Sequence, residues 1–323
     1  MARGWRRVGR RRFWYVDARN NPIDDEEQLE RIRGLAIPPA WTDVWISPNA
    51  RARLQATGVD AAGRKQYRYH ASFRAAQERE KFERLTEFAA RLPRFRGRMA
   101  RHLRGGSYEY EWTSALAVGV INKAWFRVGS DRHARGSRTY GVTTLTKRHV
   151  TVARDEIRFC FRAKNRKLVR RAITNAQFAE GVMELLALNG SRLFRFERDG
   201  ELANLTSPLL NSYLDQHLGE GFTAKDFRTW GGTLLAAVEL ERHGPPESDH
   251  AAKRALAAVM RAVGDELGNT PAVARASYVS PVVVDHYLAG RTIGEFRSSN
   301  GSVPRHFTTA ESALAALLAT PID

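Results

Sequence analysis

Residues 65–92 change from one repeating pattern to another, and this change decides the fold class. In Lys65-Gln66-Tyr67-Arg68-Tyr69, tyrosine alternates with polar residues, so a strand would carry both tyrosines on one face. In Phe82-Glu83-Arg84-Leu85-Thr86-Glu87-Phe88-Ala89-Ala90-Arg91-Leu92, apolar residues recur instead at helical spacing, at Phe82, Leu85, Ala89 and Leu92. We therefore predict β structure before residue 73 and mainly helices after it, with the first long helix ended by Pro93.

The residues before this change predict a small β-rich domain. Arg12–Val16 and Val44–Ser47 are rich in β-branched and aromatic residues, and Leu54–Asp60 is a third candidate strand. The acidic run Asp24-Asp25-Glu26-Glu27 predicts the start of a short helix, because carboxylates are favoured near helix N-termini. Ile37-Pro38-Pro39 ends that helix.

The residues after it predict a larger, mainly helical domain. A helix through Ala117 is expected to stop at Gly129, and a β-hairpin is expected from Thr143–Val152 and Ile157–Phe161. Further helix signals are starts at Thr174/Asn175, Thr223 and Ser280-Pro281, an amphipathic face at Leu256, Val259, Met260, Val263 and Leu267, and a last helix from Thr308/Thr309 to Leu318. The predicted fold class is α+β: a small β-rich N-terminal domain (1–75) and a larger, mainly α-helical domain with an embedded β-hairpin (76–323).

The charge of the chain indicates a polyanionic partner. Lysine and arginine (52) exceed aspartate and glutamate (35) by 17, an excess that attracts nucleic acid or an anionic membrane surface. No run of about 18 apolar residues is present to span a membrane, and the basic start lacks the apolar core of a secretory signal. With Cys160 alone, neither an internal disulfide nor a thiolate metal cage can form. We therefore expect a cytoplasmic, globular protein that does not span a membrane and that binds a polyanion.

Basic residues occur in three separate blocks, Arg64–Arg104, Arg127–Arg148 and Arg162–Arg171. The first block holds 13 lysines and arginines against 4 acidic residues. Such blocks suit a groove that contacts many phosphates along a duplex, whereas a merely solvated helix face is the alternative. Gln66 and Tyr67 could hydrogen-bond base edges or phosphates from a strand, unless the tyrosines pack into a sheet core.

Common catalytic signatures are missing from the sequence. It contains no phosphate-binding Gly-x-x-x-x-Gly-Lys-Ser/Thr loop, no Gly-x-Ser-x-Gly turn and no His-Glu-x-x-His zinc helix. Its nine histidines are scattered, and no acidic cluster for two Mg²⁺ ions is evident. Phosphoryl chemistry without metal or ATP would need a side-chain nucleophile, cations on the non-bridging oxygens and an acid for the leaving oxygen. Composition does not select these residues.

A resemblance to a known family indicates which residues could be the nucleophile, the cations and the acid. The chain resembles the type IB DNA topoisomerases of the small bacterial and poxvirus kind, in five landmarks that follow the family's order. These are Ile37–Trp45 with Gly63–His70; Phe126-Arg127-Val128-Gly129; Tyr140–Leu145 with Phe161-Arg162-Ala163-Lys164; Lys225-Asp226-Phe227-Arg228-Thr229-Trp230; and Gly268-Asn269-Thr270-Pro271 with Arg275-Ala276-Ser277-Tyr278.

The resemblance implies a role for each matching residue. Tyr278 would attack the scissile phosphate and form a 3′-phosphotyrosyl ester. Arg127 and Arg228 would hold the non-bridging oxygens, and Lys164 would protonate the leaving 5′-oxygen. Asn269 would donate to a non-bridging oxygen, at a position where many family members have histidine. The resemblance implies duplex DNA as the partner, no cofactor, a monomer and a bacterial, nucleoid-associated location, with an N-terminal clamp that binds DNA through Arg64, Lys65, Gln66, Tyr67 and Tyr69.

Two other interpretations are open at this point. A tyrosine recombinase would use the same nucleophile, but recombinases carry His-x-x-Arg where this chain has Lys225-x-x-Arg228, and their N-terminal arm is usually helical. A non-catalytic architectural DNA binder would use the basic blocks, with Tyr278 serving only in packing. The presence of all five catalytic positions argues against the architectural binder.

Overall fold

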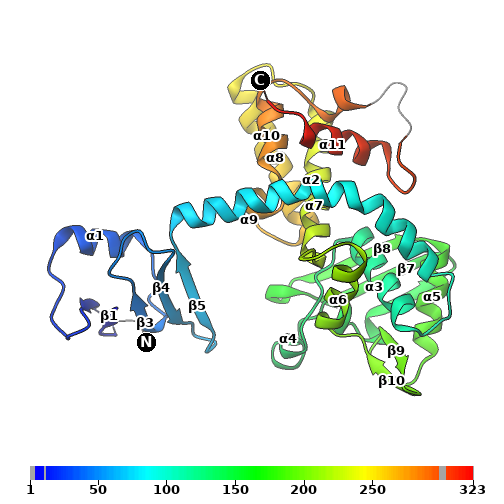
Figure 1. The fold of residues 1–323 in the computed structure, drawn as a ribbon, viewed down its shortest axis with the longest axis horizontal. Coiled ribbons are helices and arrows are strands. Elements are labelled where there is room, and N and C mark those ends of the chain that lie inside the picture. Colours follow the sequence, from blue (N-terminus) through cyan, green and yellow to red (C-terminus); the bar gives the residue numbers. More distant parts are fainter. Residues whose placement is uncertain (1–3, 11, 298–302, 323) are drawn as a thin grey trace. The chain divides into compact units, whose positions relative to one another are not determined.

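The computed structural model describes residues 4–10, 12–297 and 303–322, with the backbone alone over 74–79 (Figure 1). The outer limits of the two expected domains, Met1 and Asp323, lie outside the described residues. The chain divides into two compact units, Met1–Lys81 and Phe82–Asp323. The α+β fold class predicted from the sequence is confirmed, since a β-sheet unit precedes a mostly helical one.

The N-terminal unit is built on an antiparallel sheet with the strand order β2-β1-β3-β4-β5. Helix α1 (Glu26–Gly34) begins where the acidic run predicts, and the Asp25 carboxylate accepts a hydrogen bond from the Gln28 N–H at 2.8 Å. Ile32 of α1 packs in a small core with Val44, Ile46 and Ala56 of the sheet. The strands are β1 (Trp5–Val8), β2 (Trp14–Val16), β3 (Thr42–Ile46), β4 (Leu54–Val59) and β5 (Lys65–Tyr69).

Strand β1 was not predicted, because its sequence reads only as a basic segment. Its pairing with β2 and β3 supplies what the sequence lacks, and Arg7 donates to the carbonyl oxygens of Pro38 (3.1 Å) and Trp41. Strand β1 therefore forms because of its pairing with other strands and not because of a local sequence pattern.

Helix α2 (Ala71–His102) corrects the prediction that Pro93 ends the first long helix. Proline lacks an N–H and usually breaks a helix interior. Here the apolar stripe continues through Pro93, and Leu92, Phe95 and Met99 are all buried. Burial of such side chains gives about 1.5–3 kcal/mol each, which offsets the lost hydrogen bond.

Helix α3 (Tyr110–Ala124) is buried along most of its length and ends earlier than predicted. Trp125, not Gly129, terminates it: Trp125 is left-handed (φ 52°), and its N–H donates to the Ile121 carbonyl at 2.8 Å. The following residues leave the helix and pair with a later segment, since the Arg127 carbonyl accepts from the Val142 N–H at 2.9 Å. Arg127 thus lies on an extended segment after the helix.

The expected β-hairpin is part of a three-stranded antiparallel sheet, β6-β7-β8. The strands are β6 (Val150–Ala153), β7 (Glu156–Arg162) and β8 (Leu168–Thr174), whereas Val142–Thr144 (η1) and Lys147–His149 (η2) are 3-10 turns and not strand. Strand β8 was not predicted, because its arginines read as part of a basic block facing solvent. A further hairpin, β9 (Arg195–Arg198) with β10 (Glu201–Asn204), was not predicted, although the Asp199-Gly200 pair between its strands is a typical hairpin turn and both residues are left-handed.

The predicted helix starts at Asn175, Thr223 and Ser280 are confirmed, since each residue is an N-cap. The amphipathic face from Leu256 to Leu267 is buried, as predicted. The remaining elements are α4 (Asp131–Gly136), η3 (Lys164–Arg166), α5 (Ala176–Ala187), α6 (Ser207–His217), α7 (Ala224–His243), α8 (Asp249–Leu267), α9 (Pro271–Ser277), α10 (Pro281–Leu288), η4 (Ile293–Phe296) and α11 (Thr309–Ala319). Within the described ranges, no helix is long and apolar enough to cross a membrane.

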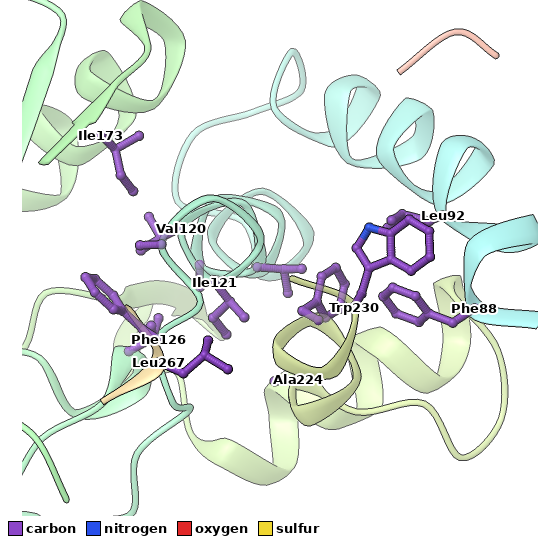
Figure 2. Close-up of a cluster of buried hydrophobic side chains, with 14 of the residues drawn as sticks. Phe88, Leu92, Val120, Ile121, Phe126, Ile173, Ala224, Trp230 and Leu267 are labelled. Atoms are coloured by element: carbon purple, nitrogen blue, oxygen red, sulfur yellow. The ribbon is translucent and has the colours of Figure 1, made fainter. Parts of the chain in front are cut away.

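The core of the C-terminal unit gathers around α3 and α7. Figure 2 shows Phe88 and Leu92 of α2 beside Trp230 of α7, and the Phe88 and Trp230 ring centroids lie 6.2 Å apart. Phe126 packs edge-on against Phe161 of β7 at 5.1 Å. The packing thus runs from α2 through α7 to α3, which contacts strand β8 of the sheet.

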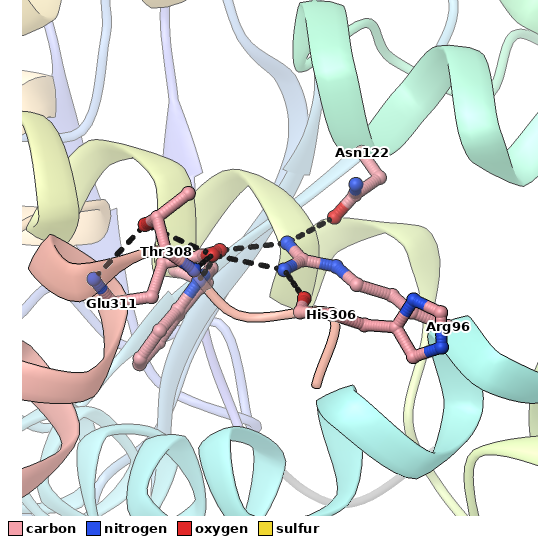
Figure 3. A network of polar contacts seen from close by, with 6 residues as sticks. Arg96, Asn122, His306, Thr308 and Glu311 are labelled. Atoms are coloured by element: carbon pink, nitrogen blue, oxygen red, sulfur yellow. Dashed lines mark hydrogen bonds and ion pairs between the residues drawn. The ribbon is translucent and has the colours of Figure 1, made fainter. Parts of the chain in front are cut away.

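A buried ion pair fastens the end of the chain to this core (Figure 3). Glu311 of α11 accepts from both terminal nitrogens of Arg96, at 2.7 and 2.9 Å, and from the Trp230 indole N–H at 3.2 Å. It also accepts from the Thr308 N–H at 2.9 Å, while Arg96 donates to Asn122 at 2.9 Å. Helices α2, α3, α7 and α11 meet in this network.

Candidate active site

Arg228 is a buried cation on the first turns of α7. Thr223 caps this helix, its N–H donating to the Asp226 carboxylate at 2.7 Å. The Arg228 guanidinium donates to the carbonyl of Trp125 and, at 2.9 Å, to that of Leu267. Arg228 is only 4% exposed to solvent, and its buried Nε has no hydrogen-bond partner in the described part of the chain. Burial, together with the nearby charge of Arg127, lowers the pKa of Arg228.

The Arg228 guanidinium is held by two carbonyl oxygens and by a hydrogen bond with the Tyr278 side chain, so an anion would supply the opposite charge that the guanidinium lacks. Moving an ion out of water costs several kcal/mol unless an opposite charge compensates. Among the described residues, Arg228 forms no ion pair with a carboxylate. The unpartnered Nε fits one more acceptor oxygen, as a phosphate would supply.

Arg127 lies beside Asn269. The Arg127 Nη2 donates to the Asn269 side-chain carbonyl at 2.7 Å. Asn269 follows the end of α8, where Gly268 is left-handed (φ 66°), and its N–H donates to the Gly264 carbonyl at 2.7 Å. This helix end thus serves both arginines: Arg228 through the Leu267 carbonyl and Arg127 through Asn269.

Tyr278 ends helix α9 and faces Arg228. The Arg228 guanidinium carbon lies 5.0 Å from the Tyr278 ring centroid. Burial alone would raise the pKa of the Tyr278 hydroxyl. The charge of Arg228, its hydrogen bond with Tyr278 and the charges of Arg127 and Lys225 outweigh burial, so the pKa lies below the ordinary value. A phenol with a lowered pKa is a better nucleophile near neutral pH.

Thr233 is a contact residue that the sequence analysis missed. Its fully buried hydroxyl donates to the Tyr278 carbonyl and accepts from the Ser280 N–H, both at 3.1 Å. A Cβ on the neighbouring Gly232 would lie 2.8 Å from the Tyr278 carbonyl, so glycine permits this close approach. Nothing in the sequence distinguishes Thr233 from the other threonines.

Lys164 lies on the turn between β7 and β8. Two consecutive left-handed residues, Asn165 (φ 61°) and Arg166 (φ 58°), shape this turn. Lys164 is exposed and lines a cavity of about 120 Å³ together with Arg127 and Arg228. The structure therefore brings Arg127, Arg228, Asn269 and Tyr278 into one contact network, with Lys164 on the wall of the adjoining cavity.

The five residues expected to contact DNA from the N-terminal unit lie on or next to β5. Tyr67 and Tyr69 are exposed and stack with centroids 6.2 Å apart, so the alternative of tyrosines packed in the sheet core is wrong. Lys65 lies over the Tyr67 ring at 5.8 Å. Arg64 and Gln66 both bind the Asp60 carboxylate, at 2.8 Å, and these contacts lower the pKa of Asp60 to about 2. Asp60 thus offsets the charge of Arg64, leaving Lys65 and the tyrosines free on this edge.

Comparison with known proteins identifies the family. Residues 70–287 match the family model described as the catalytic core of eukaryotic DNA topoisomerase I, and residues 12–60 match that of the N-terminal domain of bacterial DNA topoisomerase IB. DNA topoisomerase 1B of Acanthamoeba polyphaga mimivirus is 32% identical over 283 residues, which cover 85% of this chain and 84% of the relative. DNA topoisomerase 1B of vaccinia virus (strain Copenhagen) is 23% identical over 288 residues, covering 82% and 84%. The chain belongs to the type IB DNA topoisomerase family.

Proposed function

We propose that this protein relaxes supercoiled duplex DNA by cutting and rejoining one strand through Tyr278. The observation that carries the proposal is the uncompensated buried charge of Arg228, which lies 5.0 Å from the ring of Tyr278 and lowers its pKa. This arrangement suits a nucleophile attacking a phosphodiester, because it combines an activated phenol with a site for the phosphate.

The proposed cleavage step exchanges one phosphorus–oxygen bond for another. The Tyr278 hydroxyl releases its proton to water, and its oxygen forms a bond to the scissile phosphorus as the bond to the 5′-oxygen breaks, leaving a 3′-phosphotyrosyl ester and a 5′-hydroxyl. Lys164 gives its proton to the departing 5′-oxygen. Religation is the reverse, with the 5′-hydroxyl attacking and Tyr278 leaving.

The arginines and Asn269 would act on the two non-bridging oxygens. Negative charge grows there in the transition state, and fixed donors already aimed at it need no reorganisation. Arg228 offers its unpartnered Nε, and Arg127 is oriented by Asn269. In this role, Asn269 donates through its amide while its carbonyl holds Arg127.

Relaxation by rotation of the duplex follows from the chemistry of the ester. The phosphotyrosyl bond retains the energy of the phosphodiester, so religation needs no ATP, and the duplex beyond the nick can rotate meanwhile. The N-terminal unit (1–75 in the proposed domain division) would hold DNA through Arg64, Lys65, Gln66, Tyr67 and Tyr69. We expect a monomer without cofactor that acts on the nucleoid of a bacterial cell.

Relaxation of a supercoiled plasmid in EDTA without ATP tests the proposal, followed by a detergent quench that traps covalent protein. We expect a ladder of topoisomers and protein linked to 3′ ends. Tyr278→Phe should bind DNA and leave the linking number unchanged. DNA binding without any change of linking number in the wild type would contradict the proposal and favour an architectural binder or a recombinase without its target.

A further inference from the structure

We infer that the ion pair between Arg171 and Glu266 positions Lys164 for proton transfer. The inference rests on the proposed role of Lys164 as the general acid. Neither residue would touch the DNA; both would act by fixing the hairpin that carries Lys164.

One strand of this hairpin is anchored close to Lys164. The Arg162 carbonyl at the end of β7 accepts from the Tyr140 N–H at 2.7 Å. Just before it, Phe161 packs on Phe126 at 5.1 Å. This anchor lies two residues from Lys164 and fixes the β7 side of the hairpin.

The other strand is anchored by Arg171 of β8. Its Nη1 forms an ion pair with the Glu266 carboxylate, and its Nη2 donates to the Glu266 backbone carbonyl at 3.0 Å. Both side chains are partly buried, at 27% and 34% exposure. A planar guanidinium held at two points fixes direction as well as distance.

Glu266 connects this anchor to the phosphate-binding arginines. It occupies the last turn of α8, next to Leu267, whose carbonyl holds Arg228, and three residues before Asn269, which holds Arg127. Arg171 therefore ties the general-acid hairpin to the helix end that orients both arginines. The C-terminal end of α8 would therefore hold both the arginines that bind the phosphate and the hairpin that carries the general acid.

The ion pair matters because packing does not fill the space between hairpin and helix. The cavity of about 120 Å³ is lined by hairpin residues (Ala163, Lys164, Lys167–Arg171) on one side and by Asp265–Gly268 on the other. Partly exposed ion pairs contribute little to the stability of a fold. We therefore expect loss of the pair to disturb the position of Lys164 more than the stability of the fold.

The test uses a DNA substrate whose 5′-bridging oxygen at the cleavage site is replaced by sulfur. A thiolate leaves without being protonated, so the sulfur substrate does not need the general acid. Glu266→Gln should cleave the oxygen substrate on the order of 10- to 100-fold more slowly than wild type in a single turnover. It should cleave the sulfur substrate at nearly the wild-type rate. Because one preparation cleaves both substrates, the ratio of rates does not depend on the fraction folded.

Arg171→Gln separates positioning from charge. Glu266→Gln removes a negative charge near Lys164, whereas Arg171→Gln removes a positive one, so a purely electrostatic effect would shift the two variants in opposite directions. Positioning predicts the same sulfur-rescued defect in both, and no further loss in the double variant. Opposite shifts, or equal defects on both substrates, would overturn the inference.

Two controls complete the design. Glu241→Gln removes a similar two-point ion pair, with Arg297 (2.7 and 3.0 Å), at the far end of α7, and should cleave both substrates like wild type. Lys164→Ala should be slow on oxygen and rescued by sulfur. If Lys164→Ala is rescued and Glu266→Gln is not, the positioning role is wrong while the proposed function stands. If Lys164→Ala itself is not rescued, the general-acid role fails, and this inference with it.

Discussion

Two arginines lie on opposite sides of helix α7 and differ in what compensates their charge. Arg96 packs against the α7 side that carries Trp230 and is fully paired with the buried carboxylate of Glu311. Arg228, on the helix itself, is more deeply buried, and its partners are two carbonyl oxygens and the Tyr278 side chain instead of a carboxylate, while the Nε atoms of both arginines lack a partner among the described residues. The charge of Arg96 is balanced within the fold, whereas that of Arg228 would be balanced by the phosphate that the proposed reaction requires. Burial alone therefore does not separate the two arginines; they differ in whether a carboxylate balances their charge.

The largest effect on activity is expected at Arg228. Arg228→Ala should slow single-turnover cleavage by at least about 10²- to 10³-fold, because a fixed donor to the developing charge is lost. Its free energy of unfolding should change less than that of a variant that breaks the Arg96 pair, since removing an uncompensated buried charge relieves its desolvation. Cleavage kinetics and urea denaturation measure the two quantities. Near-wild-type cleavage would contradict the comparison.

The largest effect on stability is expected at Glu311. Glu311→Ala leaves Arg96 buried and unpaired, which costs about 3–5 kcal/mol in the free energy of unfolding. Cleavage per folded molecule should stay close to that of the wild type. A double variant, Arg96→Met with Glu311→Leu, should recover most of the loss, because apolar replacement removes both charges together. A stable Glu311→Ala protein with poor cleavage would instead place Glu311 in the active site.

The contribution of the Arg96–Glu311 ion pair to stability should depend on pH. Burial acts to raise the pKa of Glu311, but its contacts with Arg96, Thr308 and Trp230 outweigh this and leave the pKa below the ordinary value. The stabilisation is therefore full above the unfolded-state pKa of about 4.3 and is lost as the pH falls through the lower folded-state value. The difference in melting temperature between wild type and Glu311→Gln should shrink only below that pH. A difference that vanished already between pH 7 and 5 would show that another group titrates.

A smaller effect on activity is expected at Thr233. Thr233→Val keeps the shape but removes the hydroxyl that holds the Tyr278 backbone, and should slow cleavage on the order of tenfold. Thr233→Ser keeps the hydroxyl and serves as the matched control. Equal rates for the two variants would mean that the hydrogen bonds of Thr233 do not position Tyr278.

The smallest effect is expected at Asn269. Asn269→His should remain active, because histidine can also donate a hydrogen bond to a phosphate oxygen. Its cleavage rate should gain a dependence on pH near the ordinary histidine pKa of about 6.5, which the neutral amide lacks. A pH–rate profile of both proteins tests this, and an inactive variant would show that the amide is needed to hold Arg127.

The sequence alone determined the features that depend on local chemistry. The caps at Asn175 and Thr223 were predictable because their side chains accept from N–H groups only two or three residues away. The stripe from Leu256 to Leu267 was predictable because its spacing is helical. The fold class and the family followed from such patterns and from the order of short motifs. The roles of Tyr278 and its neighbours remain predictions from that resemblance.

Only the tertiary structure decided the features that depend on residues far apart in the chain. Pro93 stays inside α2 because the helix buries apolar residues on both sides of it, and β1 and β8 form because other strands pair with them. Glu311 is 215 residues from Arg96, and Thr233 is 45 from Tyr278, so no local pattern connects them. The difference between a paired and an unpaired buried arginine is likewise invisible in sequence, because charge compensation is a property of the space around a side chain.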